Sequence, residues 1–321
     1  MRGPGVRRQF TIHNSQFRNC IRNCFRAWAG RNCILAALIV GAGMALSAQT
    51  FRSRVVTVPV TATVVDAQGR LVRGLTRDDF QVYEDGIEQP VTQFTDERVP
   101  VSLGLLLDAS DSMRGRPMVD ASAAVEHFVG ELLKEEDEAF IALFNHRPRL
   151  AASWTRPASA LKQRLGTVQA GGGTAIYDAV VQAAPFFDKR ARPRAALVVI
   201  SDGADTASDR TLQQAREAVV RRDAFVYAVA IDEVDAQAST RVNPAALSDL
   251  TSPTGGYTEV VRSAVDLGPA TARIADELNS QYTIGFNPSK PPDGTWRGLR
   301  VRVKRGGLTV RSRRGYVAEV H

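Results

Sequence analysis

The stretch from residue 52 to residue 99 alternates apolar and polar positions in the way that β-strands do. The segment "VVTVPVTATVVD" (55–66) is rich in valine and threonine and has a period of two. Turn residues at 66–70 ("DAQGR") and an Asp-Gly pair at 85–86 separate it from the next alternating segments. The pattern predicts a β segment without a helix over 52–99.

From residue 101 apolar runs of strand length alternate with segments of helical period. The predicted strands are 101–107, 138–144, 149–154, 195–201, 225–231 and 256–261, and the predicted helices lie near 117–134, 173–188, 209–222, 243–250 and 266–279. Strands that alternate with helices of this length form right-handed βαβ units. We therefore expect an α/β domain over 100–279, with a doubly wound, mostly parallel sheet and helices on both of its faces.

From residue 281 the period of two returns. The strand "QYTIGF" (281–286) precedes a Pro- and Gly-rich loop, and the segment 299–317 predicts a hairpin across Gly306-Gly307. Neither 52–99 nor 280–318 is large enough to bury a core alone. We predict that these two flanking segments pair in space into one small β domain, from which the α/β domain emerges.

The first 48 residues have a different composition. Seven arginines and no acidic residue precede the apolar segment "CILAALIVGAGMALSA" (33–48). An uncharged core of about 15 residues suits a signal peptide and is short for a membrane-spanning helix. We expect residues 1–48 to be a signal peptide, cleaved after Ser47 or Ala48, and the mature protein to be periplasmic or extracellular. The alternative is an uncleaved anchor that holds the protein in the inner membrane through residues 33–48.

Charge and cysteine content narrow the function classes. The formal net charge of +7 comes from the seven arginines of the leader, because the rest of the chain holds as many basic as acidic residues. This balance argues against nucleic acid as a partner. The three cysteines are Cys20, Cys24 and Cys33. After cleavage the chain has no disulfide, no thiol nucleophile and no thiolate metal site.

Five polar residues follow the ends of two predicted strands and a glycine-rich loop of the α/β domain. Three follow the apolar strand 101–107, one follows the triple glycine 171–173, and one follows the strand 195–201. They are Asp108, Ser110, Ser112, Thr174 and Asp202. Ligands of open α/β sheets bind beyond the carboxyl ends of the strands, so these five residues form the candidate site.

The pattern D-x-S-x-S, with a distant Thr and a distant Asp-Gly, resembles the von Willebrand factor A (VWFA) family over residues 100–279. In that family these positions form a metal-ion-dependent adhesion site (MIDAS). The resemblance implies that Asp108, Ser110, Ser112, Thr174 and Asp202 hold one divalent cation. The segments before and after the domain are similar to bacterial VWFA-related proteins of the Acidobacteria type.

The donor types agree with that implication. Carboxylate and hydroxyl oxygens are hard ligands that suit Mg²⁺, with Mn²⁺ and Ca²⁺ as further options. Only Asp108 and Asp202 are charged, so a bound cation stays electrophilic and can accept an outside carboxylate. We therefore expect an exported, adhesion-type module that is not an enzyme and that captures an Asp or Glu of a protein partner. The family usually has glycine where this chain has Asp111, whose carboxylate either faces solvent or repels an acidic ligand.

Other interpretations of the same residues stay open. Asp and Ser near a helix start are often caps, and Thr174 could cap the helix 175–188. A metal-dependent hydrolase, in which the cation activates water, would need a His or Glu close to Thr174 or Asp202 in space. Ser112 has no evident partner base, and His127 and His146 each stand alone in the sequence. If the leader is not cleaved, the protein would be a membrane-tethered assembly component.

The segment 297–314 carries eight basic residues and no acid. Arg300, Arg302 and Lys304 share one face of the predicted strand. We interpret this face as a solvated surface of the sheet. The alternative is a contact for anionic lipid head groups or cell-wall polymers.

Overall fold

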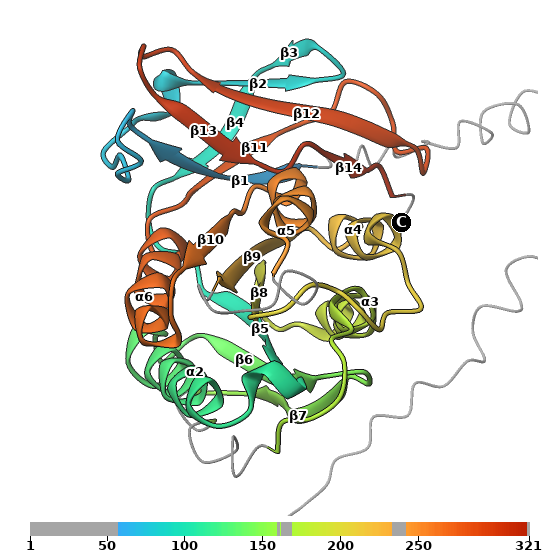
Figure 1. Ribbon diagram of the computed structural model, residues 1–321. Coiled ribbons are helices and arrows are strands. Elements are labelled where there is room, and N and C mark those ends of the chain that lie inside the picture. The colour runs from blue at the N-terminus through green and yellow to red at the C-terminus, as the bar shows by residue number, and fades with distance from the viewer. Residues whose placement is uncertain (1–56, 159–160, 162–168, 233–241, 320–321) are drawn as a thin grey trace, which may run out of the picture. The chain divides into compact units, whose positions relative to one another are not determined.

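The structure is a computed structural model that describes residues 57–158, 161, 169–232 and 242–319 (Figure 1). The predicted signal peptide or anchor at 1–48 lies outside the described residues. Within the described part of the chain, no helix has the length and apolar character needed to cross a membrane.

The α/β domain is built on a six-stranded sheet with the order β10-β9-β8-β5-β6-β7. Its strands are β5 (Val101–Asp108), β6 (Glu138–Phe144), β7 (Arg149–Thr155), β8 (Arg194–Ser201), β9 (Ala224–Ile231) and β10 (Thr258–Val261). All neighbours pair in parallel except β7, which runs antiparallel to β6. Every residue of β5, β6, β8 and β9 is buried, which agrees with strands covered on both faces.

Helices cover both faces of this sheet. The helices and helical turns are η1 (Arg77–Asp79), η2 (Asp111–Met113), α2 (Arg116–His127), η3 (Phe128–Leu132), α3 (Ile176–Ala183), η5 (Ala184–Lys189), α4 (Leu212–Val220), α5 (Pro244–Thr251), η6 (Ser252–Thr254), η7 (Ala264–Asp266) and α6 (Leu267–Leu278). Helices α2 and α6 share one apolar core with Leu103, Leu105 and Leu107 of β5. Helices α3, α4 and α5 share the other core with Leu106 (Figure 1). The predicted doubly wound, mostly parallel α/β fold is confirmed.

The flanking segments form two four-stranded antiparallel sheets, with the orders β13-β1-β11-β4 and β14-β12-β2-β3. Their strands are β1 (Val58–Val65), β2 (Phe80–Glu84), β3 (Ile87–Gln89), β4 (Val91–Thr95), β11 (Tyr282–Phe286), β12 (Trp296–Val303), β13 (Thr309–Ser312) and β14 (Gly315–Val317). Each sheet contains strands from both ends of the described chain, as in the pairs Val58↔Phe286 and Leu299↔Glu84. The two sheets enclose a third apolar core, so the α/β domain is inserted into one β domain.

The predicted hairpin across Gly306-Gly307 is wrong. The chain does reverse there, and Gly307 has a φ of 77° that favours glycine. However, β12 pairs with β2 and β14, whereas β13 pairs with β1 in the other sheet. The turn crosses between the sheets because Val301 and Val310 both pack into the core that the sheets enclose.

A buried carboxylate joins the two domains. Glu277 of α6 is 2% exposed and accepts hydrogen bonds from the hydroxyls of Thr63 in β1 and Tyr227 in β9, each at 3.0 Å. It also accepts from the guanidinium of Arg311 in β13. Burial raises the pKa of Glu277, although Arg311 and the two hydroxyls act in the opposite direction. One side chain thus ties the last helix of the α/β domain to the β domain.

We expect Glu277→Ala to destabilise the protein by about 3–5 kcal/mol, because it leaves the Arg311 charge and two buried hydroxyls without their shared acceptor. Glu277→Gln keeps an acceptor oxygen for the hydroxyls and should lose less. The neighbouring Asp276→Ala is the matched control, since Asp276 is 69% exposed and its ion pair is with exposed Arg73. Denaturant unfolding measures the effect, and equal losses for Ala at 276 and 277 would contradict it.

Candidate metal-binding site

Asp108 is the last residue of β5 and is fully buried. Its Oδ1 accepts the backbone N–H of Ser110 at 2.8 Å, and its Oδ2 accepts the hydroxyl of Ser201 at 2.5 Å. Ser201 ends the adjacent strand β8, and sequence analysis did not select it. The sequence could have pointed to Ser201, because it is a hydroxyl residue at the end of an apolar strand, directly before Asp202. The carboxylate therefore lies at the carboxyl end of the central strands, where α/β sheets bind ligands.

Burial raises the pKa of Asp108 to about 7. The hydrogen bonds from Ser201 and Ser110 lower it, and the nearby Asp202 carboxylate raises it further. None of the largest effects on this pKa comes from a basic side chain of the described residues. The charged form of Asp108 is therefore under-compensated, and a cation at this position would stabilise it.

A line of oxygen atoms leads from this buried corner to the surface. The Ser110 and Ser112 hydroxyls are 3.1 Å apart, and the Ser112 hydroxyl donates to Oδ1 of Asp202 at 2.7 Å. Ser110 is buried, Asp202 is half-buried and Ser112 is exposed. The structure thus brings together Asp108, Ser110, Ser112 and Asp202, which the sequence places up to 94 positions apart.

Thr174 lies on a loop that is hydrogen-bonded to this cluster through its backbone. Gly171 N–H donates to Ala109 O at 2.8 Å, and Asp111 N–H donates to Gly172 O at 2.9 Å. The N–H of Thr174 donates to the Thr206 hydroxyl at 3.1 Å. The Thr174 side chain is buried, and among the described residues no hydrogen bond joins its hydroxyl to the other four candidates.

This loop bears on two alternatives from the sequence. The N-cap of α3 is Ala175, which makes no side-chain cap bond, so Thr174 is not the cap of this helix. The imidazole of His146 packs against Gly172, where a Cβ would lie 2.4 Å from Nδ1. Gly172 has a φ of 87°, and this close approach adds a second reason for glycine. An exposed histidine therefore stands near the loop that carries Thr174.

The Asp111 carboxylate faces solvent. It forms an ion pair with Arg114 at 2.6 Å, and the two side chains are 64% and 68% exposed. Water screens such a pair, so it adds little to stability. Asp111, at the position where the family usually has glycine, therefore adds one charge at the surface beside Ser112. It does not interrupt the contacts that join Ser110, Ser112 and Asp202.

The donor set fits a small, hard cation. Adjacent corners of an octahedron with metal–oxygen distances of about 2.1 Å are about 3 Å apart. The hydroxyl–hydroxyl and hydroxyl–carboxylate contacts of 3.1 and 2.7 Å span this value. Among the residues that the structure describes, no group of three or more His, Cys, Asp or Glu is arranged to hold a metal. Hydroxyl oxygens would therefore supply part of the ligand set.

Comparison with known proteins identifies the type of domain. Residues 103–204 match the family model of the von Willebrand factor type A domain. The chain is 32% identical over 83 residues to the uncharacterized protein sll0103 of Synechocystis sp. (strain ATCC 27184 / PCC 6803 / Kazusa). This match covers 25% of the chain and 20% of the relative, so the chain spans a minor part of that protein.

Two solved structures share the fold. A von Willebrand factor type A protein from Catenulispora acidiphila has a TM-score of 0.50 at 14% identity, covering 81% of this chain and 73% of that one. Proximal thread matrix protein 1 from the mussel byssus, described as having a zinc-occupied MIDAS motif, has a TM-score of 0.52 at 13% identity. That match covers 62% of this chain and 50% of the mussel chain. At these identities the likeness concerns the fold alone.

The buried carboxylate predicts a pH dependence of the metal-free protein. The pKa of Asp108 is about 7 in the folded state and near 3.8 when unfolded. Its contribution to stability is therefore complete below the unfolded pKa and is lost as the pH rises through the folded pKa, by at most about 1.4 kcal/mol per pH unit. Denaturant unfolding in EDTA should show this loss for the wild type and for Asp111→Asn. Asp108→Asn should lack it, and an unchanged slope in this variant would refute the assignment.

Proposed function

The chain carries a von Willebrand factor type A domain, and on this premise we propose that the domain is a metal-ion-dependent protein-binding module. The cation would be held by Asp108, Ser110, Ser112, Thr174 and Asp202. The observation that carries the proposal is the fully buried Asp108 carboxylate, which accepts the Ser110 N–H, while the Ser110 hydroxyl contacts the exposed Ser112 hydroxyl and that hydroxyl contacts Asp202. The zinc-occupied MIDAS motif of the mussel protein supports a divalent cation in this fold.

When bound, the cation supplies an electrophilic position that an outside carboxylate can fill. The chain's own residues prepare this position. Asp108 is oriented by the Ser110 N–H and the Ser201 hydroxyl, and Asp202 is oriented by Ser112. Two carboxylates balance the charge of one divalent ion and neutral hydroxyls complete the set, so a further carboxylate would meet no excess negative charge in the ligand set when it coordinates the ion. We propose an Asp or Glu of a partner protein as that ligand and Mg²⁺ as the preferred ion.

Asp111 and Arg114, which are not proposed ligands, form an exposed ion pair next to Ser112. A carboxylate that approaches the Ser112 end would meet repulsion from Asp111 and attraction from Arg114. We propose that this pair influences which acidic partner is accepted, without changing cation binding. The export of the protein, through cleavage or retention of residues 1–48, belongs to the same proposal and rests on the sequence. The mass of the protein isolated from cells distinguishes a cleaved leader from an anchor.

A second candidate function is metal-dependent hydrolysis. The observation in its favour is the packing of His146 against Gly172, since this places a histidine beside the loop that carries Thr174, where a hydrolase would need its base. Turnover of p-nitrophenyl phosphate that requires added metal and disappears in His146→Ala would establish it. Metal binding without turnover leaves binding as the function.

We expect divalent metal to raise the thermal stability of the full-length protein. A cation at 100 times its dissociation constant stabilises the folded state by about 2.7 kcal/mol. Mg²⁺, Mn²⁺, Ca²⁺ and Zn²⁺ are each compared with EDTA by following the unfolding midpoint. Asp202→Asn and Ser112→Ala remove ligands near the surface and should abolish the shift, whereas Asp111→Asn should keep it. A wild type that does not respond to any of these ions at millimolar concentration contradicts the proposal.

The proposed capture of a partner's carboxylate is tested separately from cation binding. The protein is immobilised with Mg²⁺ and exposed to purified candidate partners, and each acidic surface residue of a partner that binds is replaced by its amide. One replacement should abolish binding, and EDTA should release the unmodified partner. Asp202→Asn should fail to bind under the same conditions. Binding that survives EDTA would show that the contact does not use the cation.

A further inference from the structure

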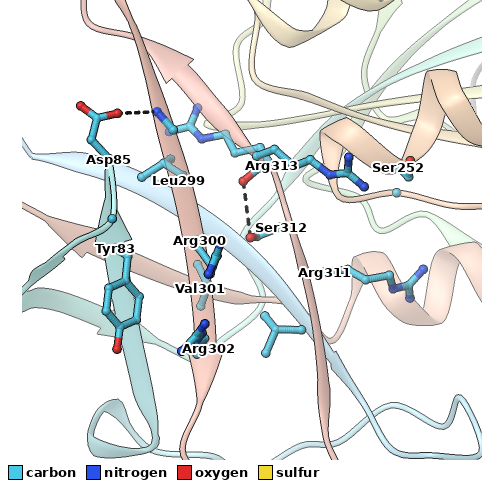
Figure 2. Close-up of a pocket in the computed structure, with 15 residues that line it drawn as sticks. Tyr83, Asp85, Ser252, Leu299, Arg300, Val301, Arg302, Arg311, Ser312 and Arg313 are labelled. Carbon is cyan, nitrogen blue, oxygen red and sulfur yellow. Dashed lines mark hydrogen bonds between the residues drawn. The ribbon is translucent and has the colours of Figure 1, made fainter.

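The β domain contains a groove that the metal site does not use. It has a volume of about 760 Å³ and lies between β12 and β13, with Tyr83 of β2 and Ser252 of η6 at its sides. Figure 2 shows Tyr83 and Arg302 on neighbouring strands, with Arg311 and Ser312 across the groove.

The groove is strongly basic. One acid, Asp85, lines it together with five arginines, which are Arg300, Arg302, Arg311, Arg313 and Arg314. The guanidinium groups of Arg311 and Arg313 pair with Glu277 and Asp223. The other three arginines are exposed and have no ion pair with a described residue. Asp85 accepts the N–H of Gly298 and pairs with Lys290, so the groove keeps an excess of unpaired positive charge.

One wall of the groove is an open strand edge. Strand β14 pairs only with the first three residues of β12, Trp296 to Gly298. On the same edge the N–H of Leu299 donates to Arg314 O. Because backbone groups alternate between the two edges of a strand, Val301 and Val303 point their N–H and C=O groups to this edge as well. Strand β13 pairs with β1 and not with β12, so beyond Leu299 this edge of β12 has no paired strand.

The side chains beside this edge alternate in character. Arg300 and Arg302 are exposed on the outer face, and Leu299 and Val301 are buried on the inner face. A strand added here would therefore place every second side chain near the arginines and the others near the apolar core. Within the groove the open edge runs from the C=O of Leu299, whose N–H already donates to Arg314 O, to Arg302, which is about 10 Å at about 3.3 Å per residue.

We propose that this groove binds an extended segment of a partner protein, in which acidic residues alternate with apolar ones, as an added strand on β12. Backbone hydrogen bonds to the open edge would give affinity, and the arginines would select the acidic positions. A lipid head group or an anionic polymer would use the charge alone. The coincidence of unpaired arginines with an open backbone edge favours a peptide. This surface requires no cation and is independent of the metal site.

The test uses the full-length protein and a labelled octapeptide that alternates Glu and Val, with both ends blocked. Fluorescence anisotropy measures its binding at low and at physiological salt, and salt should weaken it. The double variant R300E/R302E should weaken binding by about tenfold or more, because two favourable charges are reversed. The control R216E/R221E makes the same change of net charge at two exposed arginines on and beside α4. It should bind as the wild type does.

Two further experiments test whether the peptide binds through its backbone as an added strand, and whether this binding is independent of the metal site. An octapeptide N-methylated at alternate residues, in either of the two registers, keeps its charge but loses backbone donors along one edge. One register should bind much more weakly than the parent. Binding should not change in EDTA or in Asp202→Asn, so that its failure is distinguishable from failure of the metal site.

Several results would overturn the proposal. These are no binding of the parent peptide, equal binding of both N-methylated peptides and the parent, or binding of phosphatidylglycerol vesicles without binding of the peptide. Unfolding midpoints are measured for each variant, and R300Q/R302Q replaces the charge-reversed variant if that protein is destabilised.

Discussion

The candidate site depends on one constraint, which is the burial of an acidic side chain at the end of a strand that is covered on both faces. Asp108 continues the apolar strand β5 without a break and has no exposed surface. Its oxygens accept one backbone N–H and one hydroxyl, and none of the largest effects on its pKa comes from a described basic group. Burial shifts the equilibrium of Asp108 toward the protonated acid, and a cation would shift it toward the carboxylate. Proton and metal therefore compete for the same group.

The periodicity of the chain was sufficient to predict the α/β domain. Strands such as β8 and β9 are continuous apolar runs, and a run of that kind requires cover on both faces. The placement of Asp108 and Asp202 next to each other follows from the same pattern, since both residues come at the ends of parallel strands that proved to be neighbours. Side-chain chemistry and strand topology together thus located the cluster before any contact was known.

Other parts of the structure could not be predicted, because they depend on contacts between residues that are distant in sequence, and the local pattern does not reveal such contacts. The segment 299–317 resembles a hairpin because the halves before and after Gly306-Gly307 both alternate, but period two does not say which sheet each half joins. Val301 and Val310 decide this by packing into one core from opposite sheets. The contacts of Ser201 and His146 were not predicted for a related reason. Each contacts a residue that is distant in sequence, namely Asp108 for Ser201 and Gly172 for His146.

The insertion of one domain into the other separates the two surfaces that bind in our proposals. The β domain contacts the amino ends of the central strands, as shown by Arg313 with Asp223 just before β9, and by Arg194 at the start of β8 with Gln281 beside β11. The candidate metal-binding residues Asp108 and Asp202 lie at the carboxyl ends of β5 and β8. An eight-residue strand is about 26 Å long, and this length separates the candidate metal site from the end of the sheet that contacts the β domain. Glu277, which contacts β1, β9 and β13 together, keeps the two surfaces at a defined separation.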